Sequence, residues 1–97
     1  MTEIILRSNK ADKASEILKE ALKTEEARIS YSLKIAQNRI LKFENKYGVS
    51  SETFNNKWSA EDLDGKDLEY VEWAGELKLA ARLSDRLATI DSIEYVS

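Results

Sequence analysis

The stretch that decides the fold runs from residue 10 to residue 47 and reads KADKASEILKEALKTEEARISYSLKIAQNRILKFENKY. It contains neither glycine nor proline, the two residues that most weaken a helix. At 100° per residue its main apolar side chains share about 100° of arc, which predicts one amphipathic helix that ends before Gly48. Apolar residues recur in this stripe every seven positions, as in a coiled coil, among them Leu22, Ile29, Leu33, Ala36 and Ile40.

Such a helix is too long for a compact domain of 97 residues. The helix would extend about 57 Å, whereas a compact domain of this length should have a diameter only slightly above roughly 30 Å. The apolar stripe therefore predicts a homodimer through the five residues just named, because apolar surface left in water costs about 25 cal/mol per Å². The alternative is a break near Thr24 and a folded-back three-helix bundle, although the stripe keeps its phase there. On a neighbouring face, Ile17, Tyr31 and Ile35 are either scattered surface hydrophobics or a second contact face.

The rest of the chain predicts a single all-α domain over residues 1–97. Ser50 and Ser51 can cap a short middle helix at 51–58, and a long C-terminal helix is expected at 67–90. Residues 1–9 form an extended segment with a β-like run of Ile4, Ile5 and Leu6. This run and the apolar tail from residue 93 are candidates for short terminal strands.

Composition narrows the function classes. The chain has no cysteine and no histidine, which removes thiolate chemistry, the commonest metal ligand and the usual general base near neutral pH. We therefore expect no enzyme, no cofactor and no metal. No stretch approaches the roughly 18 apolar residues of a membrane span, so a cytoplasmic protein without a membrane partner is expected.

The net charge of −3 is unevenly distributed, with +3 on residues 1–47 and −6 on residues 48–97. Residues 61–76 contain seven carboxylates against one lysine. Three of them share a helix face at spacings where like charges repel, which indicates either a solvated face or a docking surface for a basic partner. The candidates for partner binding are Asp62, Asp64, Asp67, Glu69, Glu72 and Glu76. A calcium loop is rejected, because Gly65 is misplaced for that motif.

Six of the eight aromatic residues fall within 31 positions around the expected middle helix. A structural core at the corner where the chain turns is the expected role, and a ligand pocket is the lesser alternative. The cluster comprises Phe43, Tyr47, Phe54, Trp58, Tyr70 and Trp73.

The stretch from Phe43 to Phe54, FENKYGVSSETF, is followed by Trp58, Asp67 and the pair Glu72-Trp73. It resembles a signature of small helical prokaryotic proteins, common in archaea and cyanobacteria, in which it follows a long charged helix. The resemblance covers residues 29–88. Members of that group look like antitoxin partners of small ribonuclease-type toxins in two-gene modules.

The resemblance implies a non-enzymatic protein that neutralises a small basic toxin. The acidic segment would face the toxin in place of RNA phosphates, and Ile4, Ile5 and Leu6 would add a strand to its sheet edge. The alternative is a structural coiled-coil homo-oligomer without another partner. A DNA-associated regulator using Lys34, Arg39, Lys42 and Lys46 is disfavoured, because the mild net charge argues against nucleic-acid binding.

Overall fold

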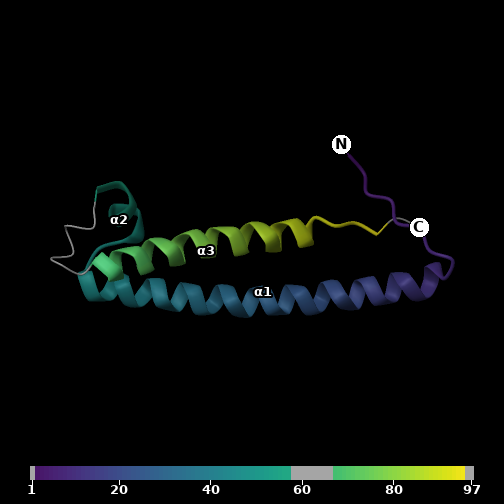
Figure 1. The fold of residues 1–97 in the computed structure, drawn as a ribbon, viewed down its shortest axis with the longest axis horizontal. Coiled ribbons are helices and arrows are strands. Elements are labelled where there is room, and N and C mark those ends of the chain that lie inside the picture. Colours follow the sequence, from purple (N-terminus) through teal and green to yellow (C-terminus); the bar gives the residue numbers. More distant parts are fainter. Residues whose placement is uncertain (1, 58–66, 96–97) are drawn as a thin grey trace.

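The computed structural model describes residues 2–57 and 67–95, and this part of the chain contains three helices (Figure 1). Helix α1 spans Ala11–Tyr47, α2 spans Ser51–Lys57 and α3 spans Asp67–Asp91. The prediction of a long, a short and a second long helix is confirmed. Short terminal strands are absent from the described residues, because the segments around Ile5 and Ile93 have no neighbouring strand to pair with.

Helix α1 is continuous over 37 residues, so the alternative of a break near Thr24 is wrong. The helix begins after Lys10, whose backbone N–H donates to Ser8 Oγ at 3.0 Å. It ends at Gly48, whose φ of 66° is in the left-handed region, and the Gly48 N–H donates to the Glu44 carbonyl at 2.8 Å. Glycine suits this position because a side chain would strain that backbone conformation.

The short helix α2 has its N-terminus fixed by two side chains. Ser50 Oγ accepts from the Thr53 N–H at 3.2 Å, as an N-cap residue does. The Glu44 carboxylate accepts from the Ser51 N–H at 2.8 Å. The carboxylate therefore joins the last turn of α1 to the first turn of α2, which sets the sharp corner between them.

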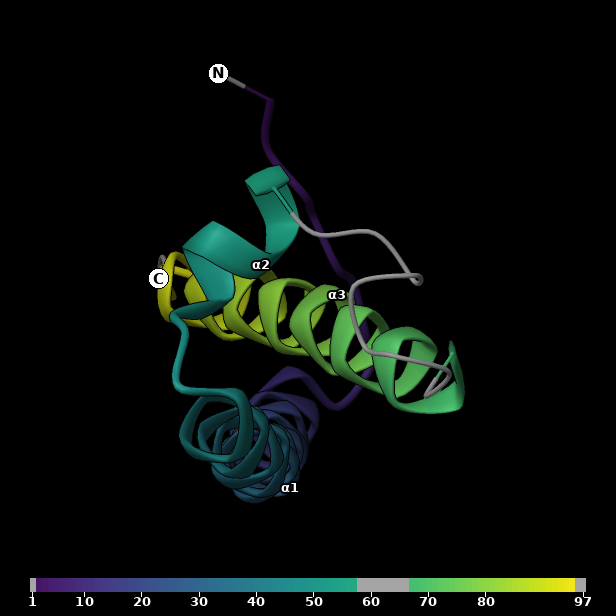
Figure 2. The ribbon, with the colours of Figure 1, turned by 90° about the vertical axis from the view of Figure 1, so that its left-hand side faces the viewer.

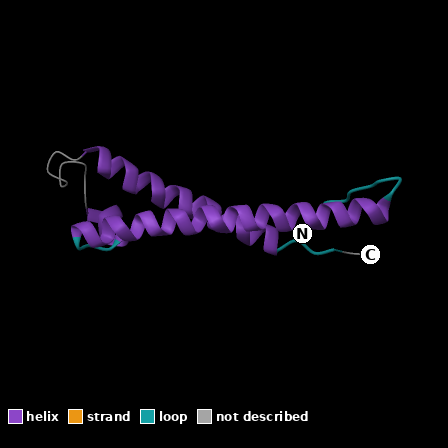
Figure 3. Cartoon of the chain, turned by 90° about the horizontal axis from the view of Figure 1, so that it is seen from below, coloured by secondary structure: helices purple, strands orange, loops and turns teal. Residues whose placement is uncertain are grey.

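The molecule is a rod of 61 × 26 × 17 Å with a radius of gyration of 19.2 Å. Helix α3 returns antiparallel to α1 and packs against it at a shallow crossing angle (Figures 1 and 3). Because α1 has 37 residues and α3 has 25, α1 extends about 12 residues, or about 18 Å, past the end of α3. We call residues 11–22 of α1 the overhang.

The core of this hairpin is thin. Ile29 and Ala36 of α1, Phe54 of α2, and Trp73 and Leu83 of α3 are the buried hydrophobic residues of the described chain. Viewed along α1, the two long helices lie side by side, and α2 sits near α3 at the end where the chain turns (Figure 2). Side chains on the remaining faces of both long helices stay largely in solvent.

Candidate interaction surface

The stripe predicted to form the dimer interface faces α3 of the same chain over much of its length. Ile29 and Ala36 are 0% and 1% exposed in the single chain. Leu22, Leu33 and Ile40 are half-buried. The structure thus brings these five residues together along one face, but the neighbour that covers its centre is α3. The sequence shows that such a stripe needs a cover and does not show where the cover comes from.

Trp73 organises the aromatic residues at the end of the rod where α1, α2 and α3 meet, which we call the closed end (Figure 1). Its ring stacks on Phe54 at 4.0 Å between centroids, and on Phe43 and Tyr47 at 5.6 and 5.8 Å. Its indole N–H donates to Ser51 Oγ at 3.1 Å, which satisfies the polar atom of a fully buried side chain.

Tyr70 completes this cluster against Phe54, with the ring centroids 4.9 Å apart. Trp58, the sixth aromatic residue of the prediction, lies outside the described residues. The five rings that are described come from all three helices. They fill the corner as packed core, in which Trp73 and Phe54 are 0% and 1% exposed.

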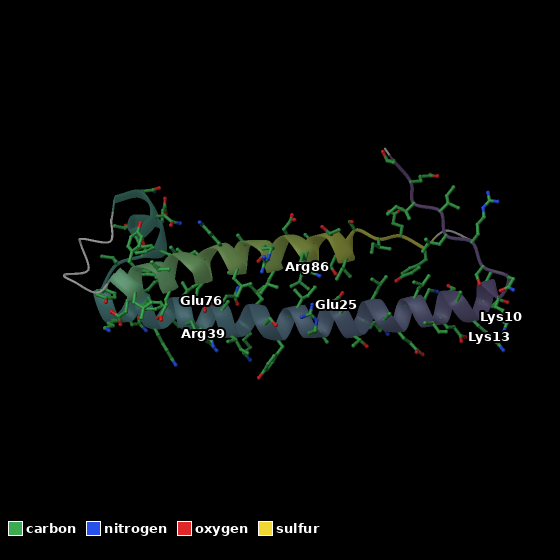
Figure 4. All side chains as sticks on the ribbon, viewed as in Figure 1. Lys10, Lys13, Glu25, Arg39, Glu76 and Arg86 are labelled. Carbon is green, nitrogen blue, oxygen red and sulfur yellow. The ribbon has the colours of Figure 1, made fainter. Side chains whose placement is uncertain are left out.

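The acidic face of α3 meets cations of the same chain. Arg39 donates to Glu76 Oε1 at 3.0 Å, and Lys46 pairs with Glu69 (Figure 4 labels Arg39 and Glu76). Lys42 and Glu72 line the groove between these pairs. The two rows of opposite charge offset the repulsion within the acidic row, which removes the need for an external basic partner at Glu69 and Glu76.

Tyr47 shares the carboxylate of Glu69 with Lys46, because its hydroxyl donates to Glu69 Oε2. This hydrogen bond to the carboxylate, together with burial and the negative charge, raises the pKa of Tyr47 above its usual value, and Lys46 offsets part of the rise.

Glu76 Oε2 is buried and accepts no hydrogen bond from the residues the structure describes.

Of the other partner-binding candidates, Asp62 and Asp64 lie outside the described residues, and Asp67 is the first residue of α3. Ile4, Ile5 and Leu6 are 89%, 71% and 70% exposed. Among the cations considered for DNA contact, Arg39 and Lys46 are engaged by α3 carboxylates.

The opposite end of the rod, where the overhang lies, is called the open end. It carries most of the exposed apolar side chains. Both described terminal segments lie here, beside the overhang of α1 (Figure 1). Eleven large hydrophobic residues are exposed in the described chain, and seven belong to this end: Ile4, Ile5, Leu6, Ile17, Leu18, Ile93 and Tyr95. An apolar concentration of this kind marks an interaction site more often than solitary exposed residues do.

A shallow groove runs between the overhang and the C-terminal tail. The Lys19 ammonium lies 4.9 Å from the centre of the Tyr95 ring, a cation–π contact that holds the tail against α1. Both charged and apolar side chains line the groove: Lys19, Glu20, Leu22, Lys23, Glu26, Ile90, Ile93 and Tyr95. Sequence reasoning identified Ile4 to Leu6 but missed this groove, because nothing in the tail's sequence shows where it docks.

Two properties of the described residues concern metal ions and membranes. They contain no group of three or more carboxylate, histidine or cysteine side chains arranged to hold a metal ion. Within the same residues, none of the helices combines the length and apolar content that a membrane span requires.

Comparison with known proteins identifies no relative. No protein-family model matches the chain, and no match was found among curated proteins or solved structures.

Proposed function

We propose that this chain is a non-enzymatic protein-interaction module that neutralises a small toxin protein and acts as a homodimer. The observation that carries the proposal is the apolar end of the rod, where seven of the eleven exposed large hydrophobic residues of the described chain gather. Covering such a surface is favourable by about 25 cal/mol per Å² of apolar area. A protein partner with its own apolar patch is the natural cover.

The position of this surface changes the expected binding mode. The resemblance implies a toxin that faces the acidic segment, but Glu69 and Glu76 already pair with Lys46 and Arg39. Releasing them to a partner would leave two cations without their carboxylates. We therefore assign toxin contact to the open end, where Ile4, Ile5 and Leu6 offer an extended apolar segment that can add to a sheet edge.

A matched pair of substitutions tests this assignment. Ile5 at the open end and Leu68 near the closed end are 71% and 70% exposed, so a change to Asp at either position places the charge in solvent. The neighbouring gene should encode a small protein that is toxic when expressed alone. Co-expression of the wild type or of Leu68→Asp should restore growth, and Ile5→Asp should not. Equal rescue by both variants would exclude the open end, and a neighbouring gene without toxicity would exclude the toxin.

The second candidate is a structural homo-oligomer with no other partner. The overhang of α1 favours it, because Leu18 is still 40% exposed although it belongs to the stripe whose central residues α3 covers. Under this function the protein purifies alone from its native source, and Ile5→Asp changes no interaction with another protein. Affinity purification of the wild type, with mass spectrometry of what accompanies it, separates the two candidates.

A further inference from the structure

Helix α1 carries a second row of residues with coiled-coil spacing, beside the row that faces α3. Its positions alternate in steps of four and three, and they lie about 80° around the helix from the Ile29 side. The N-terminal half of the row holds Ala14, Leu18, Ala21 and Glu25. None of the four is buried in the single chain.

The C-terminal half of the row holds Arg28, Ser32, Ile35 and Arg39, and none of these is buried either. The middle of the row is held by an ion pair, in which Arg28 Nε donates to Glu25 Oε1 at 2.7 Å. Both side chains keep substantial exposure, 59% for Arg28 and 36% for Glu25. They can therefore take part in a contact beyond their own pair.

The two halves of the row complement each other when two copies of the helix pair in opposite chain directions. In an antiparallel pair centred between residues 26 and 27, Glu25 faces the partner's Arg28, and Arg28 faces the partner's Glu25. Opposite charges thus meet twice at the twofold axis. A parallel pair would instead place Glu25 on Glu25 and Arg28 on Arg28, where like charges repel.

The outer layers of the antiparallel pair also match in size and polarity. Ala21 faces the partner's Ser32, two small residues that let the helices approach closely. Leu18 faces the partner's Ile35, which forms an aliphatic layer on each side of the axis. Ala14 faces the partner's Arg39 and leaves room for the arginine stem, whose guanidinium remains paired with Glu76.

The same arrangement covers the overhang. Helix α3 packs along the C-terminal two thirds of its own α1, from the stacked rings of Phe43 and Trp73 to the groove that Leu22 and Ile90 share. Reversal about residues 26 and 27 places the partner's C-terminal half, with its α3, beside residues 11–25 of the first copy. Leu18, at the edge of both rows, then lies next to a second hairpin.

We infer that α1 docks antiparallel on α1 of a second copy through this self-complementary row, with the twofold axis between residues 26 and 27. The inference deepens the homodimer of the proposed function and rests on it, and it is independent of the toxin. It moves the dimer contact from the Ile29 and Ala36 row, which α3 occupies, to the neighbouring face.

Cysteine cross-linking tests the register and direction. The chain has no cysteine, so Leu18→Cys and Ile35→Cys each introduce a single thiol at a position that is not buried. An oxidised mixture of the two variants should give a disulfide-linked dimer, while each variant alone should not. The reason is that equivalent residues lie about 25 Å apart along the axis, and a disulfide requires Cα atoms within about 7 Å.

The control is Leu41→Cys, an exposed position on the opposite side of α1. Mixed with Leu18→Cys, it should cross-link no more than background. Strong cross-linking of Leu18→Cys with itself would indicate a parallel pair and overturn the inference. Failure of the Leu18→Cys and Ile35→Cys mixture to cross-link above the control would overturn it as well.

Charge reversal at the axis provides a second, independent measurement. Glu25→Arg and Arg28→Glu should each weaken self-association at least tenfold by light scattering with mass determination, because like charges then meet at the axis. In an equimolar mixture the two variants should pair with each other as tightly as wild-type chains do, because opposite charges again meet at the axis. Wild-type association by both single variants would overturn the inference. Toxin neutralisation by these variants would show that the proposed function holds without this dimer, whereas loss of neutralisation by Ile5→Asp with an intact dimer concerns the toxin surface alone.

Discussion

The two ends of the rod differ in how completely their apolar side chains are buried. At the closed end, three helices converge, and the rings of α1 and α2 stack on Trp73 of α3, which is 0% exposed. At the open end, α1 continues alone beyond α3, and the terminal segments leave Ile4 and Tyr95 89% and 54% exposed. Stability is therefore concentrated where the chain folds back, and the surface available for contact lies where it does not.

The largest expected effect comes from opening the closed end. Trp73→Ala should lower the free energy of unfolding by about 3–5 kcal/mol, because it removes a fully buried ring that contacts three other aromatic residues. Urea unfolding followed by circular dichroism measures the loss. Leu68→Ala in the same helix, at a position 70% exposed, should change stability by less than about 0.5 kcal/mol. Similar losses for the two variants would contradict the division between the ends.

The same residue type can be compared at a covered and an uncovered position. Leu83→Ala, at a position 6% exposed, should cost about 2–5 kcal/mol at any protein concentration. Leu18→Ala, at a position 40% exposed, should cost less than about 1 kcal/mol in dilute solution. Its cost should grow with concentration if a second copy covers the overhang, because dimerisation then contributes to stability. A concentration-independent loss as large as that of Leu83→Ala would show that the overhang is covered within one chain.

Substitutions of two glycines, one at the end of α1 and one within α3, should change stability in opposite directions. Gly48→Ala should destabilise the fold by about 1 kcal/mol, because its φ of 66° is unfavourable for a residue with a side chain. Gly75→Ala should instead stabilise it by about 0.5–1 kcal/mol, because that glycine lies within α3 and an added Cβ meets nothing within 4 Å. Thermal unfolding of both variants measures the difference in sign. An equal effect of the two would contradict the C-terminal capping role of Gly48.

The smallest expected effect is a loss of stability at alkaline pH, which originates at the closed end. Because the hydrogen bond to Glu69 raises the pKa of Tyr47, the folded state favours the protonated phenol. The resulting stability is complete below the ordinary tyrosine pKa of about 10 and is lost as pH rises through the higher folded value. Stability measured between pH 9 and 11 should therefore fall, and Tyr47→Phe should reduce this fall. An unchanged alkaline profile in Tyr47→Phe would assign the effect to other groups.

Much of the secondary structure could be read from local pattern. The absence of glycine and proline between residues 10 and 47 predicts a continuous α1, and the structure has it from Ala11 to Tyr47. Gly48 stops the helix and Ser50 caps the next one, as their residue types indicate. These features depend on interactions within a few residues, so the sequence contains all the information that they require.

The partners of the acidic residues in α3 could not be identified from the local sequence pattern. Glu69, Glu72 and Glu76 share a face, and their mutual repulsion leaves two interpretations open, a solvated face or a docking surface for a basic partner. The sequence does not show that two cations of the same chain, Arg39 and Lys46, pair with this face, because the pairs span 37 and 23 residues. An external basic partner and an internal basic helix satisfy the same local rule.

The sequence by itself determined that α1 is one amphipathic helix and that its apolar stripe requires a cover. Only the tertiary structure decided that α3 covers Ile29 and Ala36, and that the overhang around Leu18 stays open. The reason is physical: helix formation depends on contacts three and four residues apart, whereas the cover depends on which distant segment returns to the stripe and on how far it reaches. Helix α3 is 12 residues shorter than α1, and the exposed surface that remains is where the chain can meet a partner.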